Sequence, residues 1–146
     1  MDMVGLHSVP VGYGTDGGDT MGVQEAPLES EYSYMPSVNS ERAFSIETGR
    51  TLLYRTLVSA KPRSMHLCII ASLKDVALFL RDNEALFVDK VKEVSIMGGV
   101  KAELEDGFLV PDSAHNNTFD PEAAAFFYRR CQELGVPLVV VGRECA

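Results

Sequence analysis

The sequence predicts an α/β fold built on a partial, open parallel sheet with flanking helices. Three short apolar runs, at residues 65–70, 93–97 and 138–141, have the length and composition of buried strands. Helical patterns at residues 73–82 and 120–134 alternate with them, which is typical of a parallel sheet. The last run, LVVV, is apolar at every position, so both faces of the sheet are expected to be covered.

Two helices are expected around the first strand. A helix over residues 45–60 would end before Pro62, because proline cannot continue a helix. After the strand, Ser72 and Asp75 have the spacing of a capping box, in which each side chain accepts a backbone N–H of the first turn. The apolar stripe of the helix that follows consists of Leu73, Val76, Ala77 and Leu80.

The second half of the sheet is separated by a long connection. The strand at residues 93–97 ends at a Gly-Gly pair, and residues 100–119 then form a loop that is long for a βα connection, which is typical of a functional segment. Asp120 and Pro121 are favoured at a helix N-cap and first helical position, and Gly135 is favoured just after a helix end. Parallel sheets bind ligands beyond the carboxyl ends of their strands, so the site is expected there.

The chain divides into two compositional zones. Residues 1–44 form a Gly/Pro/Ser-rich segment expected to be loop, and residues 45–146 form the α/β domain portion. The turn at residues 14–19 contains two aspartates and three glycines. It could suit an oxygen-ligand site, but an acidic turn is the preferred interpretation.

Composition excludes some partners. The 13 basic and 21 acidic side chains give a net charge of −8 without a basic cluster, so neither nucleic acid nor an anionic membrane is an expected partner. Cys68 and Cys131 lie in apolar runs and are expected to be buried thiols, and Cys145 an ordinary terminal thiol. Because no secretory signal or membrane span is visible and the thiols suit a reducing compartment, a cytoplasmic location is expected.

Three motifs resemble a known family. Residues 92–99 (KEVSIMGG), 116–124 (NNTFDPEAA) and 135–142 (GVPLVVVG) resemble the Met-Gly-Gly strand end, the Asn-x-x-x-Asp-Pro-Glu-Ala-Ala segment and the following strand of inosine/uridine-preferring nucleoside hydrolases. Residues 72–77 lie where that family has Leu-Thr-Asn. The order and spacing agree from about residue 6 to residue 146, and most specifically over residues 65–142.

The resemblance implies a Rossmann-like α/β fold and hydrolysis of the N-glycosidic bond of ribonucleosides to ribose and free base. It also implies a calcium ion that holds the ribose diol and the attacking water. By position, Met97 matches the methionine that packs near the ribose, and Asn116 matches the asparagine that hydrogen-bonds the ribose hydroxyls. Ile70 occupies the position whose backbone carbonyl reaches calcium.

Several family residues have no counterpart in this chain. The N-terminal Asp cluster that holds calcium is missing, and the late Asp and His of the family would lie beyond residue 146. Ala114 replaces the acidic residue two positions before Asn116, for which Asp112 could substitute. Asp75, preceded by Lys74, replaces the asparagine of Leu-Thr-Asn. No catalytic residue is therefore assigned, and the isolated chain is expected to be inactive.

Two alternatives to a hydrolase segment remain. The scaffold could serve as a non-catalytic pseudoenzyme or interaction module, as a homo-oligomer or with a partner chain that completes the sheet. A generic nucleotide-binding domain is disfavoured because the glycine-rich phosphate motifs are absent from the sequence. His115, next to Asn116, is interpreted as a packing residue rather than a proton donor.

Overall fold

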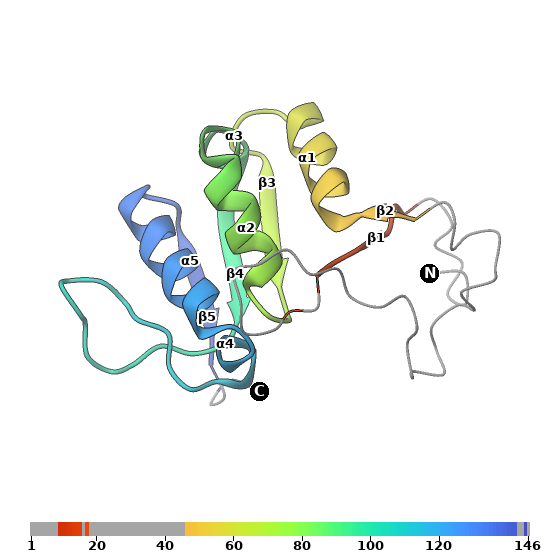
Figure 1. Ribbon diagram of the computed structural model, residues 1–146. Coiled ribbons are helices and arrows are strands. Elements are labelled where there is room, and N and C mark those ends of the chain that lie inside the picture. The colour runs from red at the N-terminus through yellow and green to blue at the C-terminus, as the bar shows by residue number, and fades with distance from the viewer. Residues whose placement is uncertain (1–8, 16, 18–45, 143–144, 146) are drawn as a thin grey trace, which may run out of the picture.

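The computed structural model describes residues 9–15, 17, 46–142 and 145 (Figure 1). Of the expected loop over residues 1–44, only residues 9–15 and 17 are described, and they include a two-residue strand; the boundary between residues 44 and 45 stays a prediction. The elements in chain order are β1 (Gly12–Tyr13), β2 (Glu47–Thr48), α1 (Gly49–Ser59), β3 (Met65–Ile69), α2 (Lys74–Asp82), α3 (Glu84–Lys90), β4 (Val91–Met97), α4 (His115–Thr118), α5 (Pro121–Glu133) and β5 (Leu138–Val141).

A three-stranded parallel sheet confirms the predicted fold class. Its order is β3-β4-β5, with Ile69 opposite Ile96 and Met97 opposite Val141. Helices α2 and α5 lie side by side across one face of this sheet, and α1 stands beside α2 and α3 (Figure 1). A separate pair of two-residue strands, β1 and β2, joins the start of the described chain to α1.

The hydrophobic core lies between the sheet and the helices. Val94 and Ile96 on β4 are fully buried, as are Phe87 on α3 and Phe127 on α5. The two phenylalanine rings meet edge to face with centroids 6.1 Å apart, a favoured aromatic geometry. This layer holds the strands in place and so positions their carboxyl ends.

The helix ends show which capping predictions were right. At α5 the Asp120 side chain accepts from the Ala123 N–H at 2.9 Å, and Gly135 adopts φ +66° after the last turn, as predicted. The capping box at α2 is half right. The Ser72 hydroxyl accepts from the Lys74 N–H at 3.3 Å, but the cap residue is Leu73 and the Asp75 carboxylate accepts from the Thr15 N–H instead of from the first turn.

The expected helix at residues 73–82 is followed by a second one. Asn83 interrupts the helix, its side-chain amide donates to the Phe79 carbonyl, and α3 then continues to Lys90. The expected helix at residues 45–60 begins later, at Gly49, where the Thr48 hydroxyl accepts from the Thr51 N–H at 3.1 Å. The predicted strand at residues 93–97 starts two residues earlier.

Only one face of the sheet is covered, so the expectation of burial on both faces is wrong for the described residues. Exposure alternates along β3 and β5, and on the uncovered side Met97 is 52%, Val139 45% and Val141 42% exposed. We call this the bare face, made of His66, Cys68, Glu93, Ser95, Met97, Val139 and Val141. Cys68 is consequently exposed, contrary to its predicted burial, whereas Cys131 is buried as predicted.

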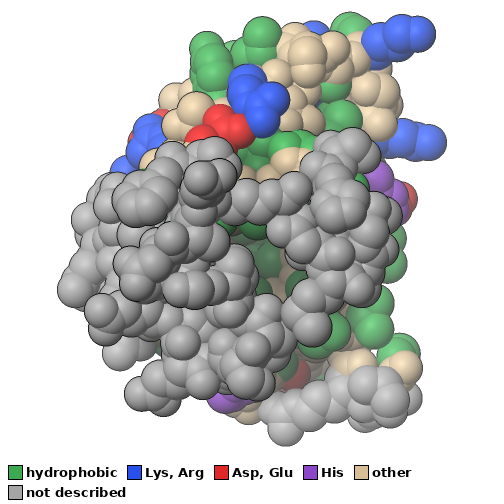
Figure 2. Space-filling model, turned by 90° about the vertical axis from the view of Figure 1, so that its right-hand side faces the viewer, with side chains coloured by type: hydrophobic (Ala, Val, Ile, Leu, Met, Phe, Trp, Pro, Cys, Tyr) green, Lys and Arg blue, Asp and Glu red, His purple; other side chains and the backbone are tan. Residues whose placement is uncertain are grey.

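Figure 2 shows hydrophobic side chains exposed at the surface along the right-hand edge of the view. On the bare face, His66 Nε2 lies 2.8 Å from Ser95 Oγ and 3.5 Å from Glu93 Oε1. The two neighbours share one ring nitrogen, so this group lacks the relay geometry of a hydrolytic triad.

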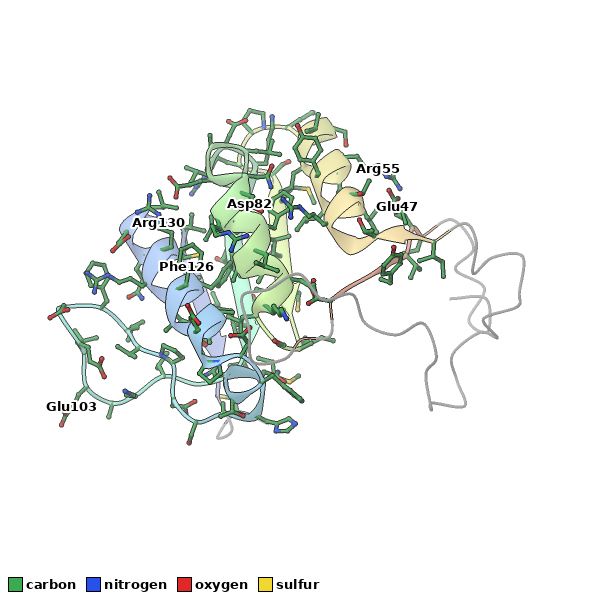
Figure 3. All side chains as sticks on the ribbon, viewed as in Figure 1. Glu47, Arg55, Asp82, Glu103, Phe126 and Arg130 are labelled. Carbon is green, nitrogen blue, oxygen red and sulfur yellow. The ribbon has the colours of Figure 1, made fainter. Side chains whose placement is uncertain are left out.

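Ion pairs join α1 to its neighbours β2 and α2. Glu47 and Arg55 point toward one another and form a two-pronged bond, and Arg50 pairs with Asp82 on α2 at 2.6 Å (Figure 3). No described helix has the length and apolar character needed to cross a membrane.

Candidate functional site

The carboxyl ends of β3 and β4 lie next to each other. Ile70 follows the last residue of β3 and Met97 is the last residue of β4, and the register of the two strands sets them side by side. Both are exposed, Ile70 by 66% and Met97 by 52%. Two of the three predicted site residues therefore share the rim at which open parallel sheets bind ligands.

Asn116 reaches the same rim from α4. Its Nδ2 donates to the Met97 carbonyl oxygen at 2.9 Å, across 19 positions of sequence. The structure thus brings Met97 and Asn116 into direct contact, as a shared sugar pocket requires. Their roles toward a ligand stay predictions.

The Gly-Gly pair after β4 is required by close packing rather than by a left-handed turn. A Cβ on Gly98 would lie 3.1 Å from both Asn117 Oδ1 and Tyr128 Oη, and a Cβ on Gly99 would overlap the Asp112 carboxylate. Neither glycine has a positive φ. Side chains from two later elements therefore close on this backbone, which fixes where β4 ends.

A buried polar cluster surrounds Gly99. Its carbonyl oxygen accepts from the Asn117 side chain at 3.0 Å, from the Asp112 N–H at 3.1 Å and from the Tyr128 hydroxyl at 3.5 Å. Burial raises the pKa of Tyr128 to about 12, and the nearby Asp112 carboxylate contributes to the rise. The hydroxyl is therefore a neutral donor at physiological pH.

Asp112 has a structural task in this cluster. Its Oδ1 accepts from the N–H of Ala114, the residue before α4, at 2.7 Å, and from Asn117 Nδ2 at 3.2 Å. Ala114 itself is buried. Whether Asp112 substitutes for the missing acidic residue of the family stays a prediction.

The expected loop at residues 100–119 contains a short β-hairpin over residues 100–111 and the helix α4 at His115–Thr118, so it is not loop throughout. Val100 pairs with Pro111 and Glu105 with Phe108 in antiparallel bridges, around Asp106 and Gly107 with φ of 52° and 82°. Two positive φ values define a type I′ turn, for which Asp-Gly is a favoured sequence. That dipeptide was the sequence signal that could have predicted the hairpin.

The hairpin is held against α5. Gln132 donates to the Leu109 carbonyl at 2.9 Å and accepts from the Leu109 N–H at 2.8 Å. The Arg129 guanidinium lies 3.8 Å from the Phe108 ring centroid, a cation–π contact. A hollow of about 320 Å³ lies between the hairpin and α5, and Phe126 of α5 lines it (Figure 3). Glu103, on the hairpin, points away from the hollow (Figure 3).

The start of the described chain is fastened to the β3 end of the rim. Asp75 Oδ1 accepts from the Thr15 N–H at 2.9 Å, and the Ser72 hydroxyl donates to the Gly17 carbonyl at 2.9 Å. Asp75 therefore has a structural task here, which the oxygen of an asparagine side chain could also perform. The aspartates of the turn at residues 14–19 lie outside the described residues.

Two further titratable residues are packing residues. The His115 ring meets Phe119 edge to face with centroids 4.6 Å apart, which agrees with its predicted packing role. Burial raises the pKa of the Cys131 thiol to about 12, so this thiol stays protonated.

The described residues do not fit a calcium site. Within them, no group of three or more His, Cys, Asp or Glu side chains could hold a metal. Calcium takes six to eight oxygen ligands, and the carbonyl of Ile70 would supply one. No chemical step is therefore assigned to a metal here.

These features define the class of protein. A parallel sheet with helices on its face and a polar rim at the carboxyl end of its middle strand is an open α/β ligand-binding scaffold. The sequence profile of the family described as inosine-uridine preferring nucleoside hydrolase matches residues 4–146. The chain therefore belongs to this family.

Solved structures agree with that assignment. A plant nucleoside hydrolase is 18% identical with a TM-score of 0.65, over 98% of this chain and 44% of its own length. A purine-preferring ribonucleoside hydrolase from Gardnerella vaginalis is 16% identical with a TM-score of 0.60, over 97% of this chain and 44% of its own. At such identities the likeness shows the fold.

A third structure is more similar in sequence. The type III effector protein XopQ, solved with adenosine diphosphate ribose, is 33% identical with a TM-score of 0.64, over 69% of this chain and 30% of its own length.

A search of curated proteins found no match. The chain spans less than half the length of all three of these structures.

Proposed function

We propose that this chain forms part of the ribose-binding wall of a nucleoside hydrolase site. The family reaction is hydrolysis of the N-glycosidic bond of a ribonucleoside to ribose and free base. The observation that carries the proposal is the 2.9 Å hydrogen bond from Asn116 to the Met97 carbonyl, since it joins the two predicted ribose contacts at one rim. Asn116 would hydrogen-bond the ribose hydroxyls and Met97 would pack on the sugar.

Binding without turnover is the expected behaviour of the isolated chain. The ribosyl carbon gains positive charge in the transition state, and a base must activate the attacking water. The described rim presents an amide and a thioether but no carboxylate with that role. Calcium, with Ile70 as one carbonyl ligand, remains an expectation of the family resemblance.

The test is a titration of the chain with ribose, inosine and uridine, followed by NMR, together with an assay of base release. We expect shifts at Met97 and Asn116, loss of binding in Asn116→Ala, and no base release. Asn83→Ala is a matched control, because it removes the same amide at the α2–α3 junction. Base release at a rate typical of enzymes, of about 1 s⁻¹ or more, would contradict the proposed inactivity.

Adenosine diphosphate ribose is a useful second ligand. The effector XopQ was solved with this compound and is 33% identical to the chain. It carries the same ribosyl group as a nucleoside, so the same rim would contact it. Competition between inosine and adenosine diphosphate ribose would show whether they share the site.

The bare face favours a second function, a non-catalytic interaction module. Parallel sheets are normally covered on both faces, and Met97, Val139 and Val141 are apolar and exposed here. A homo-oligomer or a partner chain would cover them. Light scattering after size exclusion tests this, because a stable monomer at high concentration would exclude the homo-oligomer. A cytoplasmic location also stays a prediction.

A further inference from the structure

The two adjacent asparagines of α4 hold two neighbouring points on the end of β4. Asn116 donates to the Met97 carbonyl at 2.9 Å through an exposed bond, and Asn117 donates to the Gly99 carbonyl at 3.0 Å through a buried one. The first faces the rim and the second faces the interior. This arrangement leaves Asn116 accessible to a ligand and places Asn117 where it can support the structure.

Asn117 connects three segments of chain. It is 2% exposed, and its Nδ2 also lies 3.3 Å from the Asp112 carbonyl and 3.2 Å from Asp112 Oδ1. Its backbone N–H donates to the Ala114 carbonyl at 2.9 Å. The end of β4, the base of the hairpin and α4 are thus joined through one buried amide. A buried amide has few alternative partners, so its bonds hold a single arrangement.

Helix α4 needs this support. It has four residues, and a single isolated turn is unstable because helix nucleation is unfavourable. The orientation of α4 therefore depends on its tertiary bonds, and among these the bond from Asn117 to the Gly99 carbonyl is buried. The direction of the Asn116 side chain depends on α4 in turn.

The orientation of Asn116 determines what it can bind. One of its two N–H groups is used by the Met97 carbonyl. The other N–H and the two lone pairs of Oδ1 remain, which form a donor and an acceptor side by side. Two neighbouring hydroxyls, each able to donate and accept, match this pair.

We propose that Asn117 is a positioning residue: through its buried bond to Gly99 and its part-buried bonds to Asp112 it orients Asn116 toward a vicinal diol. The inference rests on the proposed ribose-binding function, but the effect of Asn117 on the orientation of Asn116 can be measured without a ligand.

The experiment compares the full chain with Asn117→Leu, which keeps the approximate size of the side chain but removes its donors and acceptor. The first measurement is NMR of the Asn116 side-chain amide, assigned with Asn116→Ala. We expect its resonances to move to the values of a free, solvated amide in Asn117→Leu. The second measurement is the dissociation constant for adenosine diphosphate ribose, which we expect to rise about tenfold.

Two further variants separate positioning from general destabilisation. Leu57→Ala removes a buried side chain of α1, away from the rim, and should lower the melting temperature while leaving the Asn116 amide and ligand binding unchanged. Asn117→Ala also removes the donors and the acceptor, without adding a charge beside Asp112, and serves if the leucine variant does not fold. It should behave as Asn117→Leu does.

The outcomes are distinguishable. Unchanged Asn116 amide resonances in both position-117 variants would overturn the inference, as would a dissociation constant within twofold of the wild type. If the wild-type chain binds no ribosyl compound, the proposed function fails, and the amide resonances still decide whether Asn117 positions Asn116.

Discussion

The two faces of the central sheet differ in what covers them. On the helical side, Val94 and Ile96 of β4 are fully buried beneath α2 and α5. On the bare face, Met97 on the same strand is 52% exposed, and Val139 on β5 is 45% exposed. The residue types are similar, so the difference shows that burial is decided by what packs on the strand rather than by the strand itself.

The comparison also divides the candidate site. Its supporting residues, Asn117 and Tyr128, belong to the covered side, whereas Met97 and Ile70 are exposed at the rim. Among the described residues the supporting half is hydrogen-bonded except at the buried Asn117 Oδ1, which has no hydrogen-bond partner. The ligand-facing half is open, in agreement with a chain that spans less than half the length of similar structures.

Thiol reactivity should give the largest contrast between the two faces. Cys68 is exposed on the bare face, and burial raises the pKa of Cys131 to about 12. At pH 8 we expect Cys68 to react with a maleimide more than about a thousandfold faster than Cys131, which must wait for opening of the core. Mass spectrometry after timed labelling measures both rates, with Cys68→Ser to confirm the assignment. Equal rates would mean that the core is open in solution.

Removal of a side chain from the covered side should cost most of the stability. Phe127→Ala deletes a ring that is fully buried and packs on Phe87. We expect a loss of about 3–5 kcal/mol in the free energy of unfolding, from urea titration followed by circular dichroism.

Val139→Ala on the bare face is the matched control for this measurement. We expect it to cost less than about 1 kcal/mol, because the side chain is 45% exposed. A loss comparable to that of Phe127→Ala would indicate that another polypeptide surface covers this face in solution.

High pH should destabilise the covered side through Tyr128. Its pKa is raised to about 12 in the folded chain, above the ordinary tyrosine value of 10.0, mainly by burial. The unfolded chain therefore loses this proton first, and stability falls as pH rises from 10 toward 12. Tyr128→Phe should weaken this dependence in denaturant titrations. An unchanged pH profile in the variant would assign the loss to other groups.

The smallest effect is expected at the solvent-facing ion pairs of the helices. Bonds to Arg130 lower the pKa of Glu84, and bonds to Arg129 and Arg130 lower that of Glu133. The contribution of these pairs is present above pH 4.5 and is lost as pH falls through the lowered values. Arg130→Gln should change the melting temperature little at pH 7. A large change in melting temperature at pH 7 would mean that these ion pairs help to hold the hydrophobic core together.

Much of the fold followed from local patterns. The three strands, the Asp120 cap and the glycine at the end of α5 depend on short-range chemistry, and the structure has them where they were predicted, with β4 extended by two residues at its start. The prediction missed helix α3. The chain is interrupted locally at Asn83, and the burial of Phe87 on α3 depends on residues far away in the sequence. The hairpin was missed although the Asp106-Gly107 signal was present.

The candidate site followed less completely. Met97 and Asn116 were chosen through family resemblance, and the structure brings them into contact. Asn117, Tyr128 and the structural task of Asp112 were not foreseen. Their bonds join segments up to 29 positions apart, and no periodicity in a sequence reports such contacts.

The sequence by itself determined the alternation of strands and helices, the ends of α5 and the membership of a family, because these depend on residue order over short stretches. Only the tertiary structure decided that the described helices leave one face of the sheet uncovered, that Cys68 is exposed and that the Gly-Gly pair is enclosed by Asp112, Asn117 and Tyr128. Burial and close approach are properties of what packs against a residue, and that neighbour can lie anywhere along the chain.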